Sequence, residues 1–164
     1  MAQEIAVVDA SPLIALANVD GLGWLRKLYG KAAITRAVRS EVLTGLGRPG
    51  EAEIAAAIRT RQLIVIAKEP STPPLPGLGD GEASTLRSAL AYGSRALVIV
   101  DDLSARRGAE RLGLAYTGTA GVIVDAKRRK LIKAARPVLE RIRERGFRIA
   151  NALLEAVLEE LGEA

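Results

Sequence analysis

Apolar residues are concentrated in two short continuous runs, and each run leads directly into aspartate. Residues 5–8 (Ile-Ala-Val-Val) precede Asp9, and residues 96–100 (Ala-Leu-Val-Ile-Val) precede Asp101 and Asp102. Short runs rich in Val and Ile are typical of strands buried on both faces of a parallel sheet. Ligands of open α/β sheets bind at the carboxyl ends of the strands. The pattern therefore places Asp9 and the aspartate pair at the functional edge of a predicted sheet.

Weaker apolar runs and helical periodicities fill the rest of the chain. Three further strands are predicted, at residues 32–34, 63–66 and 114–116. One helix is expected to start after Thr35 and to be broken by Gly45. The other predicted helices cover residues 12–18, 21–28, 51–61, 80–91 and 104–112, then from 117 or 119 through 127, and finally 137–145 and 150–161. Ser11 is expected to cap the first of these helices, with Pro12 at its first position.

This alternation of strands and helices favours an α/β fold in which a parallel sheet is covered by helices. The length of 164 residues fits one domain, 1–164, with a sizeable core. No run approaches the roughly 18 apolar residues of a membrane span, so no membrane partner is expected. The first residues do not resemble a secretion signal, which predicts a cytoplasmic protein.

The chain contains neither cysteine nor histidine. This absence excludes disulfides, thiolate nucleophiles, histidine-based catalysis and the usual zinc sites. Any catalytic chemistry must therefore use carboxylates, hydroxyls, Lys, Arg, Tyr or a metal held by oxygen. Oxygen ligands select Mg²⁺ or Mn²⁺.

Four acids are candidates for such a metal site: Asp9, Glu41, Glu82 and one or both of the 101–102 pair. Two carboxylates 4 Å apart repel by about 4 kcal/mol at an effective dielectric of about 20. A converging set would therefore either take up protons or bind a divalent cation. Each acid also has a structural explanation. Asp9 could cap a turn, Glu41 could be an exposed helix residue, Glu82 could favour a helix start, and the pair could supply one cap and one exposed acid.

The chain resembles the PIN-domain family, and more closely its VapC-like toxin branch, over nearly its whole length. The resemblance rests on five segments: Val-Asp-Ala-Ser-Pro-Leu-Ile (8–14), Ala-Val-Arg-Ser-Glu-Val (37–42), Gly-Glu-Ala (81–83), Leu-Val-Ile-Val-Asp-Asp with the following Ala-Arg (97–106), and Gly-Thr-Ala-Gly-Val (118–122). Two positions depart from the family pattern, since Glu82 stands where many members have Asp and Val100 where many have Thr or Ser.

This resemblance implies a three-layer α/β/α sandwich and a metal-dependent ribonuclease. Carried over position by position, the catalytic and metal-binding acids are Asp9, Glu41, Glu82 and Asp102, with Asp101 as a possible substitute or fifth member. Ser11 and Thr119 are the supporting hydroxyls, and Arg106 is the basic residue expected nearest the site. The implied reaction is attack on an RNA phosphodiester by a water that Mg²⁺ or Mn²⁺ activates. The family also suggests a homodimer and an antitoxin partner.

The net charge of +5 is unevenly distributed. Residues 127–148, the basic segment, contain ten Lys or Arg and two Glu, so the remainder of the chain is mildly acidic. Such a segment could bind RNA phosphates, an acidic segment of an antitoxin, or only water on a solvated helix face.

Two other functions compete with the nuclease hypothesis. A catalytically degenerate PIN-like module could serve only for binding or dimerisation. A phosphoacceptor signalling domain could also end a strand in Asp-Asp, but its second phosphoacceptor strand is missing after residue 102. The two main hypotheses differ in a spatial prediction, namely whether the carboxyl groups of the four acids point into one pocket.

Overall fold

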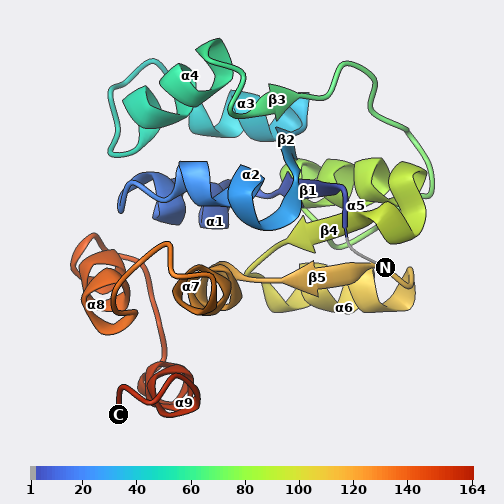
Figure 1. Ribbon diagram of the computed structural model, residues 1–164. Coiled ribbons are helices and arrows are strands. Elements are labelled where there is room, and N and C mark those ends of the chain that lie inside the picture. Colours follow the sequence, from blue (N-terminus) through green and yellow to red (C-terminus); the bar gives the residue numbers. More distant parts are fainter. Residues whose placement is uncertain (1–2) are drawn as a thin grey trace.

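The computed structural model describes residues 3–164, which form a five-stranded parallel sheet with helices on both faces (Figure 1). The strands are β1 (Ile5–Val8), β2 (Lys31–Ile34), β3 (Ile64–Val65), β4 (Ala96–Ile99) and β5 (Ala115–Thr117). They lie in the order β3-β2-β1-β4-β5, and every neighbouring pair is parallel. The predicted α/β class is thus confirmed.

The helices follow the predicted sequence of elements to within a few residues at each end. They are α1 (Ala10–Ala17), α2 (Leu22–Tyr29), α3 (Arg36–Val42), α4 (Glu51–Arg59), α5 (Asp80–Tyr92), α6 (Leu103–Arg111), α7 (Thr119–Arg128), α8 (Arg136–Glu144) and α9 (Asn151–Glu160), with a 3₁₀ turn at Gly93–Arg95. Thr35 caps α3 as predicted, because its hydroxyl accepts a hydrogen bond from the Val38 backbone N–H.

Two local predictions are wrong. Ser11 does not cap the first helix, since Asp9 occupies the N-cap position and α1 already begins at Ala10. Pro12 fits inside the first turn because the first backbone N–H groups of a helix have no intrahelical partner. Leu63 does not belong to β3, because its backbone N–H donates to the Ala57 carbonyl and its side chain is buried among the helices.

Alternating side chains of the sheet bury two separate cores. On β1, Ala6 and Val8 pack in the core that contains residues of α1, α2 and α4, whereas Ile5 and Val7 pack with α5 and α6. This division follows from the two-residue period of a strand. The result is the three-layer α/β/α sandwich that the family resemblance implied (Figure 1).

The strand order places β1 and β4 beside each other at the centre of the sheet, with Val8 opposite Ile99. From β1 the chain builds outward through β2 and β3, and α5 then brings it back to β4 on the other side of β1. This reversal opens a crevice at the carboxyl ends of the two central strands. Asp9 and Asp101 follow these two strands closely.

The C-terminal helices α8 and α9 lie outside the sandwich, beyond α7 (Figure 1). Their apolar residues, including Leu139, Ile142 and Leu158, form a third core with Ala15 of α1 and Ile123 of α7. In the part of the chain from residue 3 onward, no helix combines the length and the apolar character needed to cross a bilayer.

Candidate active site

Asp9 lies at the base of the site. Its side chain is only 6% exposed and makes no capping hydrogen bond to α1. The pKa of this carboxyl is raised to about 6, mainly by burial and to a lesser extent by the charges of Glu41, Asp101 and Asp102, against a lowering contribution from the Ala10 backbone N–H. The capping explanation for Asp9 therefore fails, and the acid is held in a position that disfavours its charge.

Glu41 approaches Asp9 across the first turn of α5. A Cβ atom built on Gly81 would lie 3.3 Å from Glu41 Oε1 and 3.5 Å from Asp9 Oδ1. The start of α3, the helix that carries Glu41, is tied to α5 by a 2.6 Å hydrogen bond between the Thr35 and Ser84 hydroxyls. The small residue at position 81 thus lets two carboxylates from different elements face the same helix turn.

Glu82 stands in that same turn and is half-buried. Its Oε1 accepts a 3.4 Å hydrogen bond from the Gly79 backbone N–H, while Oε2 is buried with no partner in the described residues. Burial raises the pKa of Glu82, and the nearby carboxylates of Asp102 and Asp9 raise it further. An unpartnered buried carboxylate oxygen is costly, which indicates that this atom is available to a ligand.

The aspartate pair divides into two roles. Both carboxylate oxygens of Asp101 accept from Thr119, one from its backbone N–H at 2.8 Å and one from its hydroxyl at 2.6 Å. Asp102 caps α6 through a 3.1 Å bond from the Ala105 backbone N–H to Oδ2. Asp101 therefore fixes the start of α7 to the end of β4, and Asp102 is the member of the pair that interacts with Glu82.

The five acids Asp9, Glu41, Glu82, Asp101 and Asp102 are called the acidic edge from here on. Glu41, Asp101 and Asp102 are exposed, and Asp9 lies beneath them. The all-oxygen donors, the partnerless Glu82 Oε2 and the raised pKa of Asp9 fit a hard divalent cation. Within residues 3–164, however, no three acids are already drawn together in the arrangement of a metal cage.

Arg106 is the basic side chain beside the acidic edge. Its Nε donates to the Val100 carbonyl at 3.2 Å, and its guanidinium carbon lies 5.8 Å from the centre of the Tyr116 ring. A Cβ atom on Gly118 would lie 2.0 Å from Arg106 Nη2 and 2.7 Å from Asp101 Oδ1, so Gly118 leaves the space that both groups occupy. Ser11 is exposed at the start of α1 and lines a cavity together with Asp101, Arg106 and Thr119.

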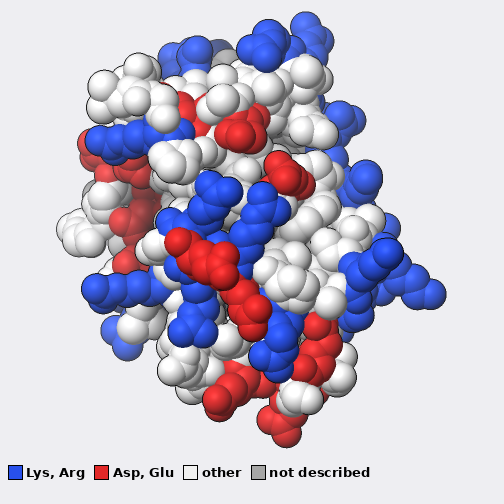
Figure 2. All heavy atoms as spheres, turned by 90° about the vertical axis from the view of Figure 1, so that its left-hand side faces the viewer, with Lys and Arg blue, Asp and Glu red and all other residues white. Residues whose placement is uncertain are grey.

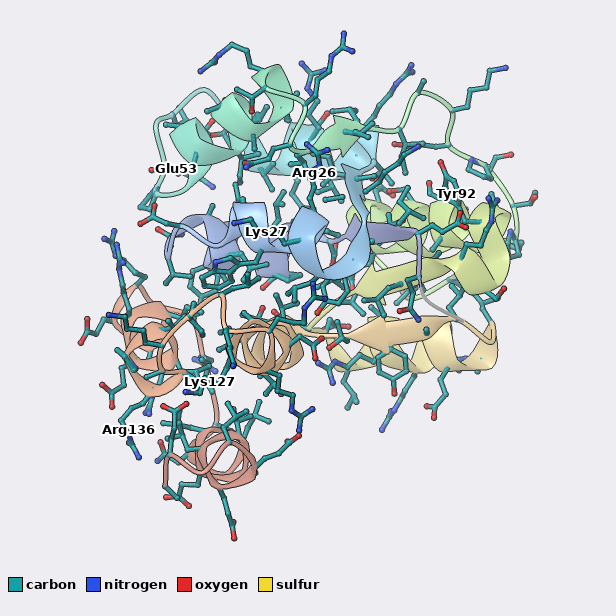
Figure 3. All side chains as sticks on the ribbon, in the orientation of Figure 1. Arg26, Lys27, Glu53, Tyr92, Lys127 and Arg136 are labelled. Carbon is teal, nitrogen blue, oxygen red and sulfur yellow. The ribbon has the colours of Figure 1, made fainter. Side chains whose placement is uncertain are left out.

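Several cations of the basic segment already contact other groups of the protein, so fewer are available to a partner than the composition indicated. Arg128 pairs with Glu160, and Arg136 pairs with Glu140 at 3.8 Å and donates to the Glu163 carbonyl at 3.0 Å. Figure 2 shows Lys and Arg interleaved with Asp and Glu on the side of the molecule where α8 lies. Figure 3 labels Lys127 of α7 and Arg136 at the start of α8. Lys127 donates to the Lys133 carbonyl at 2.5 Å. Much of this positive charge therefore stabilises the C-terminal packing.

Sequence reasoning missed several residues that shape the site. Thr35 and Ser84 join two helices, and Gly81 gives room to two carboxylates. The carboxylate of Glu69 accepts from the backbone N–H groups of Arg36 and Ala37, where α3 begins. The glycine before Glu82 was a visible signal, whereas the contact of Glu69 with α3 joins residues more than 30 positions apart and has no local signal.

A parallel α/β/α sandwich with acids at its central crevice defines the class of protein, and comparison with known proteins identifies the family. Residues 5–163 match the model of the PIN-domain family DUF3368, so the chain belongs to the PIN-domain family. PIN domains are typically nucleases.

A solved structure supports the same fold. A PilT N-terminus domain protein from the hyperthermophilic archaeon Sulfolobus solfataricus superposes with a TM-score of 0.54 at 23% sequence identity, covering 72% of this chain and 89% of that one. No curated protein matches the chain significantly.

Proposed function

We propose that residues 1–164 form one PIN domain that acts as a Mg²⁺- or Mn²⁺-dependent endoribonuclease. The observation that carries this proposal is the burial of Asp9 at the central crevice, with its pKa raised by burial and by three other acids. Clusters of mutually repelling carboxylates are costly to fold, and perturbed pKa values gather at functional sites. A divalent cation removes that cost.

Asp9, Glu41, Glu82 and Asp102 are assigned as the residues that hold the metal. When bound, the metal polarises the phosphate and lowers the pKa of the attacking water. Asp9 orients the water or accepts its proton, because its carboxylate lies buried at the base of the site, facing the same helix turn as Glu41. Glu82 Oε2, in the first turn of α5, is a further oxygen that has no partner in the described residues.

Asp101 is assigned a positioning role in this mechanism, since Thr119 already occupies both of its oxygens. Ser11 is exposed and lines the cavity beside Asp101, where its hydroxyl can hold the substrate or the attacking water. Arg106 lies beside Asp101 and can offset negative charge that develops on the phosphate.

The decisive experiment measures RNA cleavage by the purified chain with Mg²⁺, with Mn²⁺ and with a chelator, on structured and unstructured RNAs. Asp9→Asn removes the central carboxylate and keeps its size. Glu53→Gln is the matched control, because Glu53 is an exposed acid on α4 that lines a different hollow, one that contains none of the five acids of the acidic edge. Metal-stimulated cleavage that the control retains and Asp9→Asn loses is the expected result, and equal cleavage by Asp9→Asn contradicts the assignment.

The metal also has a readout that does not depend on turnover. Mg²⁺ or Mn²⁺ should raise the thermal unfolding midpoint of the wild type and of Glu53→Gln, because a ligand that binds only the folded state stabilises it. Asp9→Asn should respond much less. An equal response of all three proteins would show that the cation binds elsewhere.

The VapC-like motifs support a finer proposal, that the nuclease is the toxin of a toxin–antitoxin pair, acts in the cytoplasm and forms a homodimer. Expression in a bacterial host should then arrest growth through the same Asp9-dependent activity. Growth arrest by Asp9→Asn equal to that of the wild type would contradict a toxic nuclease, and a monomer by light scattering would contradict the homodimer.

The competing function is a catalytically degenerate PIN-like module for binding or dimerisation. The observation that favours it is the absence of a closed three-acid cage in residues 3–164. RNA binding without metal-stimulated cleavage of any RNA, together with no effect of metal on unfolding, would support this function and exclude the nuclease.

A further inference from the structure

Glu51, the first residue of α4, is a buried charged residue that the proposed mechanism does not use. It is 8% exposed, and Asp9 is the only other charged residue that is buried within residues 3–164. Burying a carboxylate is costly unless hydrogen bonds compensate for the lost water. The proposed metal site explains the burial of Asp9, and the burial of Glu51 needs a separate explanation.

Hydrogen bonds from one loop satisfy both carboxylate oxygens of Glu51. The Gly45 backbone N–H donates to Oε1 at 2.5 Å, and the Arg48 backbone N–H donates to Oε2 at 2.9 Å. The Thr44 hydroxyl lies 3.2 Å from Oε1 and 3.1 Å from Oε2. The bonds from the Arg48 and Gly45 backbone are the main reason that the pKa of Glu51 is lowered. Glu51 therefore acts as the acceptor that closes this loop.

The loop, residues 43–50, is shaped so that its donors point at one carboxylate. Gly45 has φ +77°, in the left-handed region that favours glycine, where the chain reverses direction towards Glu51. At the other end of the loop, a Cβ atom built on Gly50 would lie 3.2 Å from Ala17 Cβ and 3.5 Å from the Ile14 carbonyl oxygen. The loop is thus fixed to α1 at its end and to Glu51 along its length.

This loop follows directly on the last turn of α3, the turn that carries Glu41. Helix α3 has only seven residues, and so short a helix depends on tertiary contacts to keep its ends from fraying. Its first turn is held by the Thr35 cap and by the Glu69 carboxylate. Glu41, in contrast, is exposed. The position of its carboxylate therefore depends on how firmly the chain after α3 is held.

Glu41 and Glu51 line the same hollow. Its volume is about 220 Å³, and Thr44 and Arg48 of the loop belong to its lining. The loop that Glu51 closes is therefore a wall beside an acid of the acidic edge. A displacement of about 1 Å at a reacting centre can cost on the order of a hundredfold in rate. Firm closure of this loop thus has a direct consequence for the site.

We propose that Glu51 is a positioning residue, which holds the loop at residues 43–50 closed and so fixes the Glu41 carboxylate for the divalent cation. The inference rests on the proposed function and adds a residue that acts through Glu41. Glu51 does not itself bind the cation, because both of its oxygens accept hydrogen bonds from the loop. Residues that orient metal ligands typically change metal affinity by about ten- to a hundredfold when they are replaced.

The test measures the binding of Mn²⁺ to the full metal-free chain by isothermal titration calorimetry. Glu51→Gln keeps the size of the side chain, but places an amide NH₂ group where a carboxylate oxygen accepts backbone N–H bonds. The Kd for Mn²⁺ should rise by about tenfold or more in this variant. Unchanged Mn²⁺ affinity in folded Glu51→Gln would overturn the inference.

Two substitutions at Thr44 separate geometry from charge, because both leave the charge of Glu51 in place. Thr44→Val removes the hydroxyl and should weaken Mn²⁺ binding, whereas Thr44→Ser keeps the hydroxyl and should bind Mn²⁺ like the wild type. Thr44 is exposed, so neither change disturbs the core. Weaker binding in Glu51→Gln with wild-type affinity in Thr44→Val would show a long-range charge effect and overturn the positioning role.

Glu163→Gln is the matched control for stability. The Glu163 carboxylate also accepts backbone N–H bonds at the start of a helix, from Ala135 and Arg136 of the C-terminal region. The control should be destabilised like Glu51→Gln and bind Mn²⁺ like the wild type. An equal loss of Mn²⁺ affinity in both variants would mean that general loosening of the fold, not the position of Glu41, explains the effect.

Hydrogen exchange of the metal-free protein reports on the loop directly. The amide protons of Gly45 and Arg48 should exchange slowly in the wild type and faster in Glu51→Gln, since their acceptor is altered. The amide protons in the last turn of α3 should also exchange faster. Unchanged exchange in that turn would overturn the link between Glu51 and Glu41.

The outcomes separate this inference from the proposed function. Weaker Mn²⁺ binding in Glu51→Gln and Thr44→Val, without RNA cleavage by the wild type, would support the positioning role and overturn the nuclease. Cleavage with wild-type Mn²⁺ affinity in both variants would overturn the positioning role alone, and no Mn²⁺ binding by the wild type would overturn both. Circular dichroism checks folding, and the exposed Thr44 pair decides the question if Glu51→Gln does not fold. With active enzyme, the Mn²⁺ concentration for half-maximal cleavage should rise in Glu51→Gln.

Discussion

The acidic edge and the C-terminal helices are two charged regions of this molecule that differ in how their charges are paired. Like charges lie close together in the acidic edge, whereas opposite charges are paired in the C-terminal helices. In the acidic edge, Asp9 is buried beside like charges, and Glu82 has a buried oxygen without a partner in the described residues. In the C-terminal region, Arg128 and Arg136 face carboxylates of α8 and α9, and these pairs are about half exposed. The first region places like charges close together, whereas in the second Arg128, Arg136 and Arg141 are paired with acids.

The difference shows that net charge alone does not locate function. The basic segment was the strongest charge feature of the sequence, yet several of its cations serve packing. Arg145 and Arg148, which form no ion pair in the described structure, line hollows that also contain Glu41 and Asp101. Function is to be expected where charge lacks a structural partner.

The largest predicted effect is the loss of activity in Asp9→Asn. If Asp9 orients the attacking water or accepts its proton, its removal should lower kcat by about 10²–10⁴-fold. Single-turnover cleavage of RNA with saturating Mg²⁺ measures this rate. Removal of the paired acid Glu160, as Glu160→Gln, serves as the comparison in the C-terminal region and should leave kcat within about twofold, because the pair is exposed and neither residue belongs to the acidic edge.

The second effect concerns stability: the same substitution that lowers activity should raise the free energy of unfolding. Since the pKa of Asp9 is raised from 3.8 to about 6, ionising this carboxyl opposes folding of the metal-free protein. A shift of this size corresponds to about 3 kcal/mol. Asp9→Asn should therefore be more stable than the wild type above about pH 7. The difference should shrink as pH falls from 6 and vanish below about pH 4.

Urea unfolding in chelator, at pH values from 4 to 8, measures this difference. Equal stability of the two proteins at every pH would show that the surroundings of Asp9 do not disfavour its ionised form. The charges of the acidic edge would then oppose folding no more than those of the C-terminal helices do, and the contrast between the two regions would be wrong.

The third effect tests the division of the aspartate pair. Thr119→Val removes the hydroxyl that donates to Asp101 Oδ2 and keeps the backbone bond to Oδ1. The free energy of unfolding should fall by about 1.5–3 kcal/mol, as expected for a hydrogen bond to a charged group. The metal-induced rise in the unfolding midpoint should persist, since Asp102 is the proposed ligand. Its complete loss in Thr119→Val would assign Asp101 to the metal.

The smallest effect belongs to the paired charges of the C-terminal helices. Glu160→Gln removes the carboxylate that faces Arg128, and should lower the free energy of unfolding by no more than about 1 kcal/mol because both side chains are about half exposed. Thermal unfolding at low and high salt measures it. A larger loss would mean that this pair holds α9 in place more firmly than its exposure indicates.

Much of the fold could be predicted from local patterns. The two Val- and Ile-rich runs became the adjacent central strands β1 and β4, and each predicted helix and strand is present. The ends of helices and strands were predicted less accurately where they depend on contacts with other elements. Asp9 rather than Ser11 precedes α1, and Leu63 turns into the helical layer. These choices depend on which backbone groups find partners, and that is decided by tertiary contacts.

The sequence by itself determined the chemical repertoire and the order of the elements. Without Cys or His, the candidates were carboxylates at strand ends, and the apolar periodicities placed Asp9 and Asp101 at one edge of a parallel sheet. These features are local, because strand and helix periods depend on neighbouring residues.

Only the tertiary structure decided how each charge is used. Residues far apart in the chain meet there: Gly81 leaves space for Glu41 and Asp9, the Thr119 hydroxyl donates to Asp101, and Glu160 of α9 pairs with Arg128. Burial and the distance between charges set their energies, and both arise only when the elements pack together.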